Sequence, residues 1–160
     1  MKIINIYTDG SAKGNPGPGG YGVILEFRGQ TKELSQGFQL TTNNRMELLA
    51  VIVGLEAIKE SGYKIIIYSD SKYVVDAINK KWLFGWEKTN YKKKKNIDLW
   101  RRFMKVYRKH DVEIKWVKGH SGHPQNERCD NLAVIAANSN NLIPDKGYFE
   151  AQKKDNRLFN

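Results

Sequence analysis

Four acidic residues occur where a shared cleft could collect them: Asp9, Glu47, Asp70 and Asp130. Each is expected where a strand ends or a helix begins. Carboxylates gathered in one cleft repel one another, and hard divalent cations such as Mg²⁺ usually relieve that repulsion. The residue types and their placement therefore predict a metal-dependent site for phosphoryl transfer.

Each of these acids also has an ordinary structural explanation. Asp9 precedes a glycine, as in a common turn, and Glu47 is spaced to complete a capping box with Asn44. Asp70 could cap the helix that follows it, and Asp130 could be a solvated helix residue. The joint placement of the acids favours the site over these four separate explanations.

The elements that must position the acids follow from apolar periodicity. Alternating or β-branched residues predict strands over 3–8, 21–27, 34–40, 65–68 and 112–116. Helical spacing predicts helices over about 44–61, 71–78, 97–109 and 126–137, the first apolar on most sides and so largely buried. A tryptophan-rich turn is expected after the second helix, and residues 140–160 show no periodicity.

This order of elements predicts an α/β fold with a five-stranded mixed sheet, three strands antiparallel and two further strands parallel, flanked by helices. Right-handed crossovers make the last two strands parallel to the first. Asp9, Asp70 and the loop after Val117 then emerge at the carboxyl edge, where such sheets bind ligands. We expect one domain, 1–140, and a partly ordered C-terminal tail, 141–160.

The net charge of +10 is concentrated in one segment. Residues 80–109 contain 12 basic residues and two acids, whereas the remainder of the chain holds 15 of each sign. Such a segment is typical of a surface that binds a polyanion.

Aromatic residues are interleaved with these cations. Trp82 and Trp86 suit packing on sugars or bases, and the lysines suit phosphates; the alternative is that the tryptophans are core residues of a helical hairpin. Trp100 and Phe103 are expected to face inward. The candidate phosphate contacts are Lys92, Lys93, Lys94 and Lys95.

Two further motifs give weaker indications. Residues 17–22 match G-x-G-x-x-G, but an alternating strand follows instead of a helix, so a dinucleotide site is not expected. His120, His123 and Cys129 supply only three soft ligands, whereas a structural zinc site normally has four. We interpret His120 as a proton shuttle beside hydrated magnesium, His123 as a loop histidine bonded to backbone, and Cys129 as buried and inert.

The cellular setting is predicted from what the sequence lacks. A single cysteine allows no internal disulfide and fits a reducing compartment. The first residues do not resemble a cleavable signal, and no apolar run approaches the roughly 18 residues that span a bilayer, so we expect neither a signal nor a membrane span. We expect a cytoplasmic monomer with no membrane partner.

Several segments closely resemble ribonuclease H of the bacterial type 1 family. They are 7–11 (YTDGS), 14–22 (GNPGPGGYG), 41–48 (TTNNRMEL), 69–71 (SDS), 116–120 (WVKGH) and 126–130 (NERCD). The basic segment 80–102 resembles the basic handle of the stand-alone family members. The resemblance extends from residue 7 to about 137.

The resemblance implies hydrolysis of the RNA strand of RNA–DNA hybrids, leaving 5′-phosphate and 3′-hydroxyl ends. It implies that Asp9, Glu47, Asp70 and Asp130 bind two Mg²⁺ ions, with Mn²⁺ as a substitute. It further implies that His120 assists proton transfer or product departure.

The same resemblance indicates how the hybrid is held. Asn15, Asn43 and Asn44 match family positions that contact the hybrid in its minor groove. Lys13 and Lys72 depart from the family pattern, in which close relatives often have Cys and Gln. We therefore expect more electrostatic strand contacts here, with Lys72 among the substrate-binding residues.

Two alternative functions remain at this point. One is a hybrid-binding module without catalysis, although uncompensated carboxylates would weaken its binding to phosphates. The other is a nuclease of the same superfold, such as a junction resolvase or an integrase core, but these lack the glycine-rich loop and the lysine handle.

Overall fold

The computed structural model describes residues 2–119 and 121–157. The six strands are β1 (Ile3–Ala12), β2 (Gly17–Phe27), β3 (Gln30–Thr41), β4 (Lys64–Ser69), β5 (Asp111–Trp116) and β6 (Leu142–Ile143). The helices are α1 (Asn43–Glu56), α2 (Lys72–Asn79), α3 (Trp82–Lys88), α4 (Ile97–Tyr107), α5 (Pro124–Ala137) and α6 (Lys146–Arg157). None of the helices in this described part is both long and apolar enough to cross a membrane.

The strands form one mixed sheet in the order β5-β4-β1-β2-β3-β6. The pairs β1–β2 and β2–β3 are antiparallel, and β1–β4 and β4–β5 are parallel, which confirms the predicted α/β class. The predicted count of five strands is wrong, because β6 pairs in parallel with β3 at the edge. Two residues are too few to show the alternation that identifies a strand.

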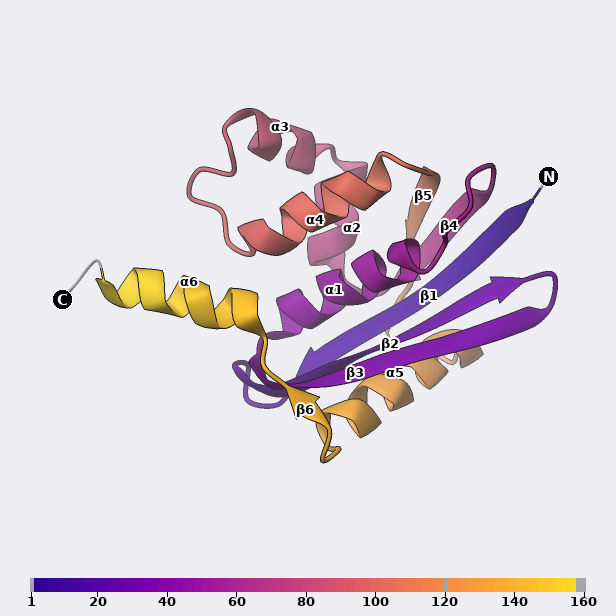
Figure 1. Ribbon diagram of the computed structural model, residues 1–160. Helices are drawn as coiled ribbons and strands as arrows, with labels where there is room; N and C mark the ends of the chain where they lie inside the picture. The colour runs from indigo at the N-terminus through magenta and orange to yellow at the C-terminus, as the bar shows by residue number, and fades with distance from the viewer. Residues whose placement is uncertain (1, 120, 158–160) are drawn as a thin grey trace.

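Helices cover both faces of the sheet. In Figure 1, α1, α2 and α4 lie on one side and α5 lies on the other. The main core lies between the sheet and α1, and α1 is buried on most sides as predicted. Trp100 and Phe103 of α4 are fully buried in this core, which confirms that they face inward.

The opposite face has a smaller apolar cluster beneath α5, formed by Tyr7, Ile24 and Cys129. The Cys129 Sγ donates a hydrogen bond to the backbone oxygen of Tyr7 at 3.2 Å, which fastens α5 to β1. Burial raises the pKa of the Cys129 thiol to about 12, and the predicted inert cysteine is confirmed as buried.

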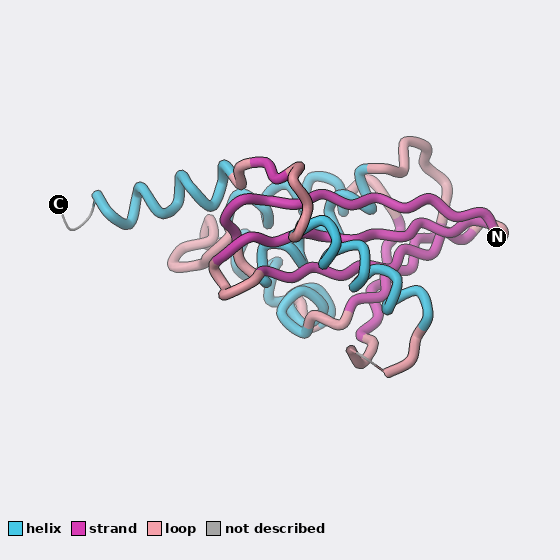
Figure 2. The backbone as a smooth tube through the Cα atoms, turned by 90° about the horizontal axis from the view of Figure 1, so that it is seen from below, coloured by secondary structure: helices cyan, strands magenta, loops and turns pink. Residues whose placement is uncertain are grey.

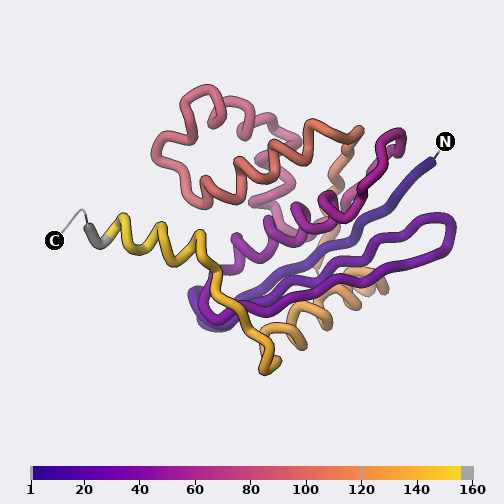
Figure 3. The backbone as a smooth tube through the Cα atoms, viewed as in Figure 1, coloured from indigo at the N-terminus to yellow at the C-terminus, as the bar shows by residue number. Residues whose placement is uncertain are grey.

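The chain beyond residue 140 has regular structure that the sequence pattern did not indicate. It adds β6 to the sheet and then forms α6, which projects away from the body (Figures 1 and 2). The smooth trace in Figure 3 shows α6 leaving on the side where the long loop of the handle lies. The expected tryptophan-rich turn is likewise a helix, α3.

An ionic network around the buried Arg45 joins three of the helices. The Arg45 guanidinium donates two hydrogen bonds of 2.8 Å to the carboxylate of Asp98 in α4. It donates two more, of 2.8 and 3.0 Å, to Asp145 immediately before α6. The hydroxyl of Thr41 also donates to Asp145, at 2.7 Å. The starts of α1, α4 and α6 are therefore held at one point.

Candidate active site

The parallel pairing of β1 with β4 brings two of the acids together. Its register aligns Tyr7 with Tyr68, whose stacked rings have centroids 4.9 Å apart. Asp9 and Asp70 each lie two residues beyond these tyrosines. Because side chains alternate along a strand, both carboxylates leave on the same side where the β1–β4 ladder ends.

Glu47 reaches the same place from the first turns of α1. Thr42 caps this helix by accepting a hydrogen bond from the backbone N–H of Arg45 at 3.3 Å, so no capping box with Asn44 is present. The helix lies directly on β1 at Gly10, where an added Cβ would lie 2.5 Å from the backbone nitrogen of Glu47. Only glycine at this position lets the three acids approach.

The three carboxylates form a compact cluster. Asp9, Glu47 and Asp70 each offer an oxygen, and these oxygens lie within 4.8 Å of one another. The buried Oε1 of Glu47 and Oδ1 of Asp70 have no hydrogen-bond partner. Ser71, not Asp70, caps α2 through a 3.3 Å bond from the N–H of Val74. The Asp70 carboxylate is therefore left for the cluster.

Burial and mutual repulsion raise the pKa values of two acids in the cluster. Burial, together with the charges of Asp70 and Asp130, raises the pKa of Asp9 to about 7, although hydrogen bonds from Glu47 and Gly10 act to lower it. Burial also raises the pKa of Glu47 well above its ordinary value, together with the charges of Asp9 and Asp70. A divalent cation would favour the ionised carboxylates and so lower both pKa values.

The donor set fits a divalent metal. Buried carboxylate oxygens without partners are costly, and hard cations such as Mg²⁺ prefer oxygen ligands. Among the residues that the structure describes, the only group of three or more His, Cys, Asp or Glu residues suited to an ion is Asp9, Glu47 and Asp70.

We expect the protein in EDTA to lose stability between about pH 5 and pH 8. The folded-state pKa of Asp9, about 7, exceeds the reference value of 3.8, so the folded state keeps a proton that the unfolded chain releases. This contribution is fully present below the unfolded pKa and is lost as the pH rises through about 7. Urea unfolding should show a loss on the order of 3 kcal/mol.

The Asp9→Asn variant is the matched control for this pH dependence. It removes the titrating group, so its stability in EDTA should change less across the same range and should exceed that of the wild type at pH 8. A wild-type curve as flat as that of Asp9→Asn would contradict the assigned proton.

Asp130 lies beside the cluster and not within it. It sits in the middle of α5, so the expectation that every acid lies at the end of an element is wrong for Asp130. Asp9 too lies inside its strand, because β1 continues to Ala12. The charge of Asp130 nevertheless contributes to the raised pKa of Asp9.

Of the two histidines predicted in the loop before α5, the structure describes His123. His120 lies outside the described residues. His123 occupies the position before α5, and its ring centroid lies 5.6 Å from that of Tyr7 and 6.3 Å from that of Tyr68. Its buried Nδ1 has no hydrogen-bond partner, so the expected bond to backbone is absent at that atom.

The three predicted asparagine contacts lie at the start of α1. The Oδ1 of Asn43 accepts a hydrogen bond from the N–H of Ala12 at 2.6 Å, and the Oδ1 of Asn15 accepts one from the N–H of Asn43 at 2.9 Å. These bonds fix the loop after β1 against α1. Asn15 and Asn44 are exposed beside it.

The predicted handle comprises α3, the following loop and the start of α4. Trp82 is 48% exposed, whereas Trp86 is half-buried with its ring edge-on to Trp100 at 5.7 Å. The ammonium of Lys80 lies 5.1 Å from the Trp82 ring centroid, and that of Lys94 lies 4.9 Å from Trp86. The loop lysines are exposed: Lys92, Lys93, Lys94 and Lys95. Trp86 is thus partly a core residue, as the alternative held.

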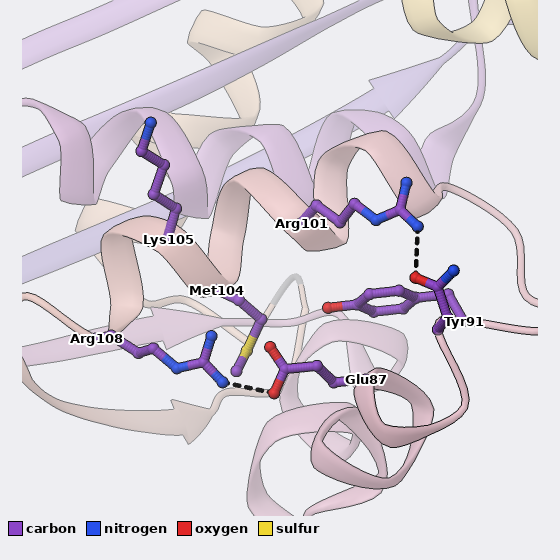
Figure 4. Close-up of a pocket in the computed structure, with 7 residues that line it drawn as sticks. Glu87, Tyr91, Arg101, Met104, Lys105 and Arg108 are labelled. Carbon is purple, nitrogen blue, oxygen red and sulfur yellow. Dashed lines mark hydrogen bonds and ion pairs between the residues drawn. The ribbon is translucent and has the colours of Figure 1, made fainter.

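Polar contacts join α3 and the loop after it to α4 and the residue that follows α4. They surround a cavity of about 510 Å³ (Figure 4). Glu87 of α3 forms an ion pair with Arg108, the residue immediately after α4. Arg101 donates a 2.8 Å hydrogen bond to Asn90, and its guanidinium lies 5.5 Å from the ring centroid of Tyr91. These contacts hold the lysine-bearing loop against α4.

Lys72 has an aromatic partner that the sequence did not indicate. Its ammonium lies 4.9 Å from the ring centroid of Trp116, which is 45% exposed at the end of β5. The Trp116 indole N–H donates a 3.2 Å hydrogen bond to the backbone oxygen of Asp70. Lys72 is therefore held next to the acidic cluster. An exposed tryptophan at the carboxyl end of a strand was the available signal.

Comparison with known proteins agrees with this architecture. The RNase H family model matches residues 1–138. The ribonuclease H of Shewanella sp. (strain ANA-3) is 53% identical over 153 residues, which cover 92% of this chain and 96% of that protein. The ribonuclease HI of Shewanella oneidensis is 54% identical, with the same coverage.

Solved structures give the same result. The crystal structure of LC9-RNase H1, a type 1 RNase H with the type 2 active-site motif, matches with a TM-score of 0.77 and 32% identity, covering 94% of this chain and 81% of that chain. The structure of LC11-RNase H1 in complex with an RNA/DNA hybrid matches with a TM-score of 0.64 and 28% identity, covering 84% and 96%.

The mixed sheet and the acidic cluster at its carboxyl edge define a metal-dependent nuclease of the ribonuclease H-like class. The chain belongs to the RNase H family and is a ribonuclease H hydrolase.

Proposed function

We propose that this enzyme hydrolyses the RNA strand of RNA–DNA hybrids with two bound Mg²⁺ ions, leaving 5′-phosphate and 3′-hydroxyl ends. The observation that carries the proposal is the cluster of Asp9, Glu47 and Asp70, with oxygens within 4.8 Å of one another. The similar LC11-RNase H1 has been crystallised with an RNA/DNA hybrid.

The carboxylates would be the protein ligands of the metal ions. Asp9 is our choice to bridge the ions, and Glu47, Asp70 and Asp130 would complete their ligands. Bound there, divalent ions would activate a water and stabilise the leaving 3′-oxygen. Mn²⁺ prefers similar oxygen ligands and would substitute for Mg²⁺. His120 would assist proton transfer or product departure.

The polar residues at the start of α1 would select RNA. The 2′-hydroxyl distinguishes RNA from DNA, and it is displayed in a wide, shallow minor groove. Asn15 and Asn43 use their side-chain oxygens on backbone N–H groups. Their amide N–H₂ groups, with that of Asn44, remain as donors for the groove.

The lysines would supply affinity without sequence information, because phosphate contacts fix position and not base identity. Lys72 would contact a phosphate next to the scissile bond, and the handle lysines would contact phosphates farther along. Trp82 and Trp86 would pack on sugars between them.

Removing the handle charges should weaken hybrid binding and leave chemistry intact. We expect a variant with Lys92, Lys93, Lys94 and Lys95 replaced by Gln to raise KM at least about tenfold with kcat almost unchanged. The dependence of log K on log salt should fall in slope by up to about 3.6 if all four lysines neutralise phosphates. Replacing two exposed lysines away from the handle, Lys32 and Lys59, is the control. An unchanged slope in the handle variant would contradict this role.

A divalent-ion titration on a strand-labelled hybrid tests the proposed reaction. We expect cleavage of the RNA strand only, complete loss in EDTA and recovery with Mg²⁺ or Mn²⁺. The cleavage products should carry a 5′-phosphate and a 3′-hydroxyl, and a ligation that requires a 3′-hydroxyl should join them. Binding without cleavage at any ion concentration would instead indicate a hybrid-binding module, and cleavage of duplex DNA would indicate another nuclease of this superfold.

A further inference from the structure

We infer that α6 is a duplex-binding arm, in addition to the handle, and that it lengthens the stretch of nucleic acid bound by the enzyme beyond the cleft and the handle. The inference rests on the proposed function, because it concerns the same RNA–DNA hybrid. It assigns a ligand to residues 146–157, which lie beyond the segment matched by the family model.

The first argument is the position of α6. Asp145, immediately before α6, accepts a hydrogen bond from Arg45. Arg45 also donates hydrogen bonds to Asp98 and, from Nη1 at 3.4 Å, to the Oδ1 of Asn96 at the end of the handle loop. Arg45 directly follows Asn43 and Asn44. The helix therefore begins between the two regions proposed to hold the hybrid, the start of α1 and the handle.

The second argument is that the direction of α6 is fixed at its base. Arg45 is 2% exposed and the Asp145 side chain is 8% exposed. An added Cβ at Gly147 would lie 2.7 Å from the Nη2 of Arg45, so the first turn of α6 rests directly on this network. Figures 1 and 2 show the remainder of the helix projecting clear of the sheet and of α1.

The third argument is the chemistry of its outer side. Lys146, Phe149 and Lys153 follow at spacings of three and four, so they share one side of the helix, which we call the outer stripe. Phe149 is 55% exposed, and the Lys153 ammonium lies 4.7 Å from its ring centroid. The same lysine-on-aromatic pair occurs in the handle, where Lys94 lies over Trp86.

The charge of the helix favours a polyanion as the occupant. Glu150 also lies beside the outer stripe and offsets one of its two lysines, so the stripe remains positive. A helix of 12 residues is about 18 Å long, which corresponds to about five base-pair steps. Contact along α6 would therefore lengthen the bound duplex by about that amount.

The test compares binding of hybrids of about 10 and about 20 base pairs, chosen to end before or after this added length. We expect Lys146→Gln with Lys153→Gln to weaken binding of the longer hybrid about tenfold and to reduce its salt slope by about 1.8. Phe149→Ala should also weaken it several-fold. All three changes should leave the shorter hybrid and kcat unaffected.

Two neighbouring residues provide matched controls. Lys154→Gln removes the same charge from a position off the outer stripe and should leave binding nearly unchanged, whereas Glu150→Gln should tighten binding of the longer hybrid. The role of α6 is overturned if the stripe variants bind both hybrids like the wild type, if they bind more tightly, or if Lys154→Gln has an equal effect. A wild-type protein that cleaves no hybrid would instead overturn the proposed function.

Discussion

Asp70→Asn should abolish cleavage of the RNA strand, lowering kcat by at least about 10³-fold while the affinity for the hybrid stays within a few-fold of the wild type. The carboxylate of Asp70 supplies one of the three clustered oxygens, and its buried Oδ1 has no other partner. An amide of the same shape keeps the packing but loses the charge that would hold the metal. Single-turnover cleavage and filter binding of a strand-labelled hybrid measure the two quantities separately.

Asp76→Asn provides the control on the adjacent helix. Asp76 forms a partly exposed i,i+4 pair with Lys80, at 3.7 Å, so its loss should leave the rate nearly unchanged. Asp130→Asn should cost less than Asp70→Asn because Asp130 lies outside the group of three. An Asp70→Asn protein that cleaves near the wild-type rate would refute the assigned site.

Periodicity and register explain how much of this site follows from the sequence. Strand alternation and crossover handedness placed Asp9 and Asp70 at one sheet edge, and the β1–β4 register aligns them. The sequence does not predict how close the Glu47 carboxylate comes to those of Asp9 and Asp70. That distance depends on α1 lying on the backbone of β1 at Gly10, which is a packing contact and has no periodic signal.

Elements that rest on long-range contacts were missed for the same reason. The strand β6 has two residues, and its identity depends on pairing with Gly37 and Phe38. The start of α6 is fixed by Asp145, whose partner Arg45 lies 100 residues away. Asp130 was misplaced because apolar spacing gives the span of α5 but not the point along it that faces Asp9.

Arg45→Met should be the most destabilising single change outside the cluster, costing about 3–5 kcal/mol of unfolding free energy. Burial alone would lower the pKa of the Arg45 guanidinium, but the hydrogen bonds that it donates to Asp98 and Asp145 outweigh burial and raise the pKa, which keeps the group charged. Its removal leaves the carboxylate of Asp145, 8% exposed, without its cation. At about 2–4 °C per kcal/mol, Tm should fall by roughly 10 °C.

Arg102→Met is the matched control, because the Arg102–Glu56 ion pair is close but its side chains are 46% and 35% exposed. An exposed pair of this kind contributes about 0–1 kcal/mol, so the loss of Tm should be slight. Arg45→Met combined with Asp98→Asn and Asp145→Asn should recover part of the stability, since no buried charge then lacks a partner. If Arg45→Met and Arg102→Met lower Tm equally, the network contributes no more than a surface pair, and α6 lacks the fixed base that its role as a binding arm requires.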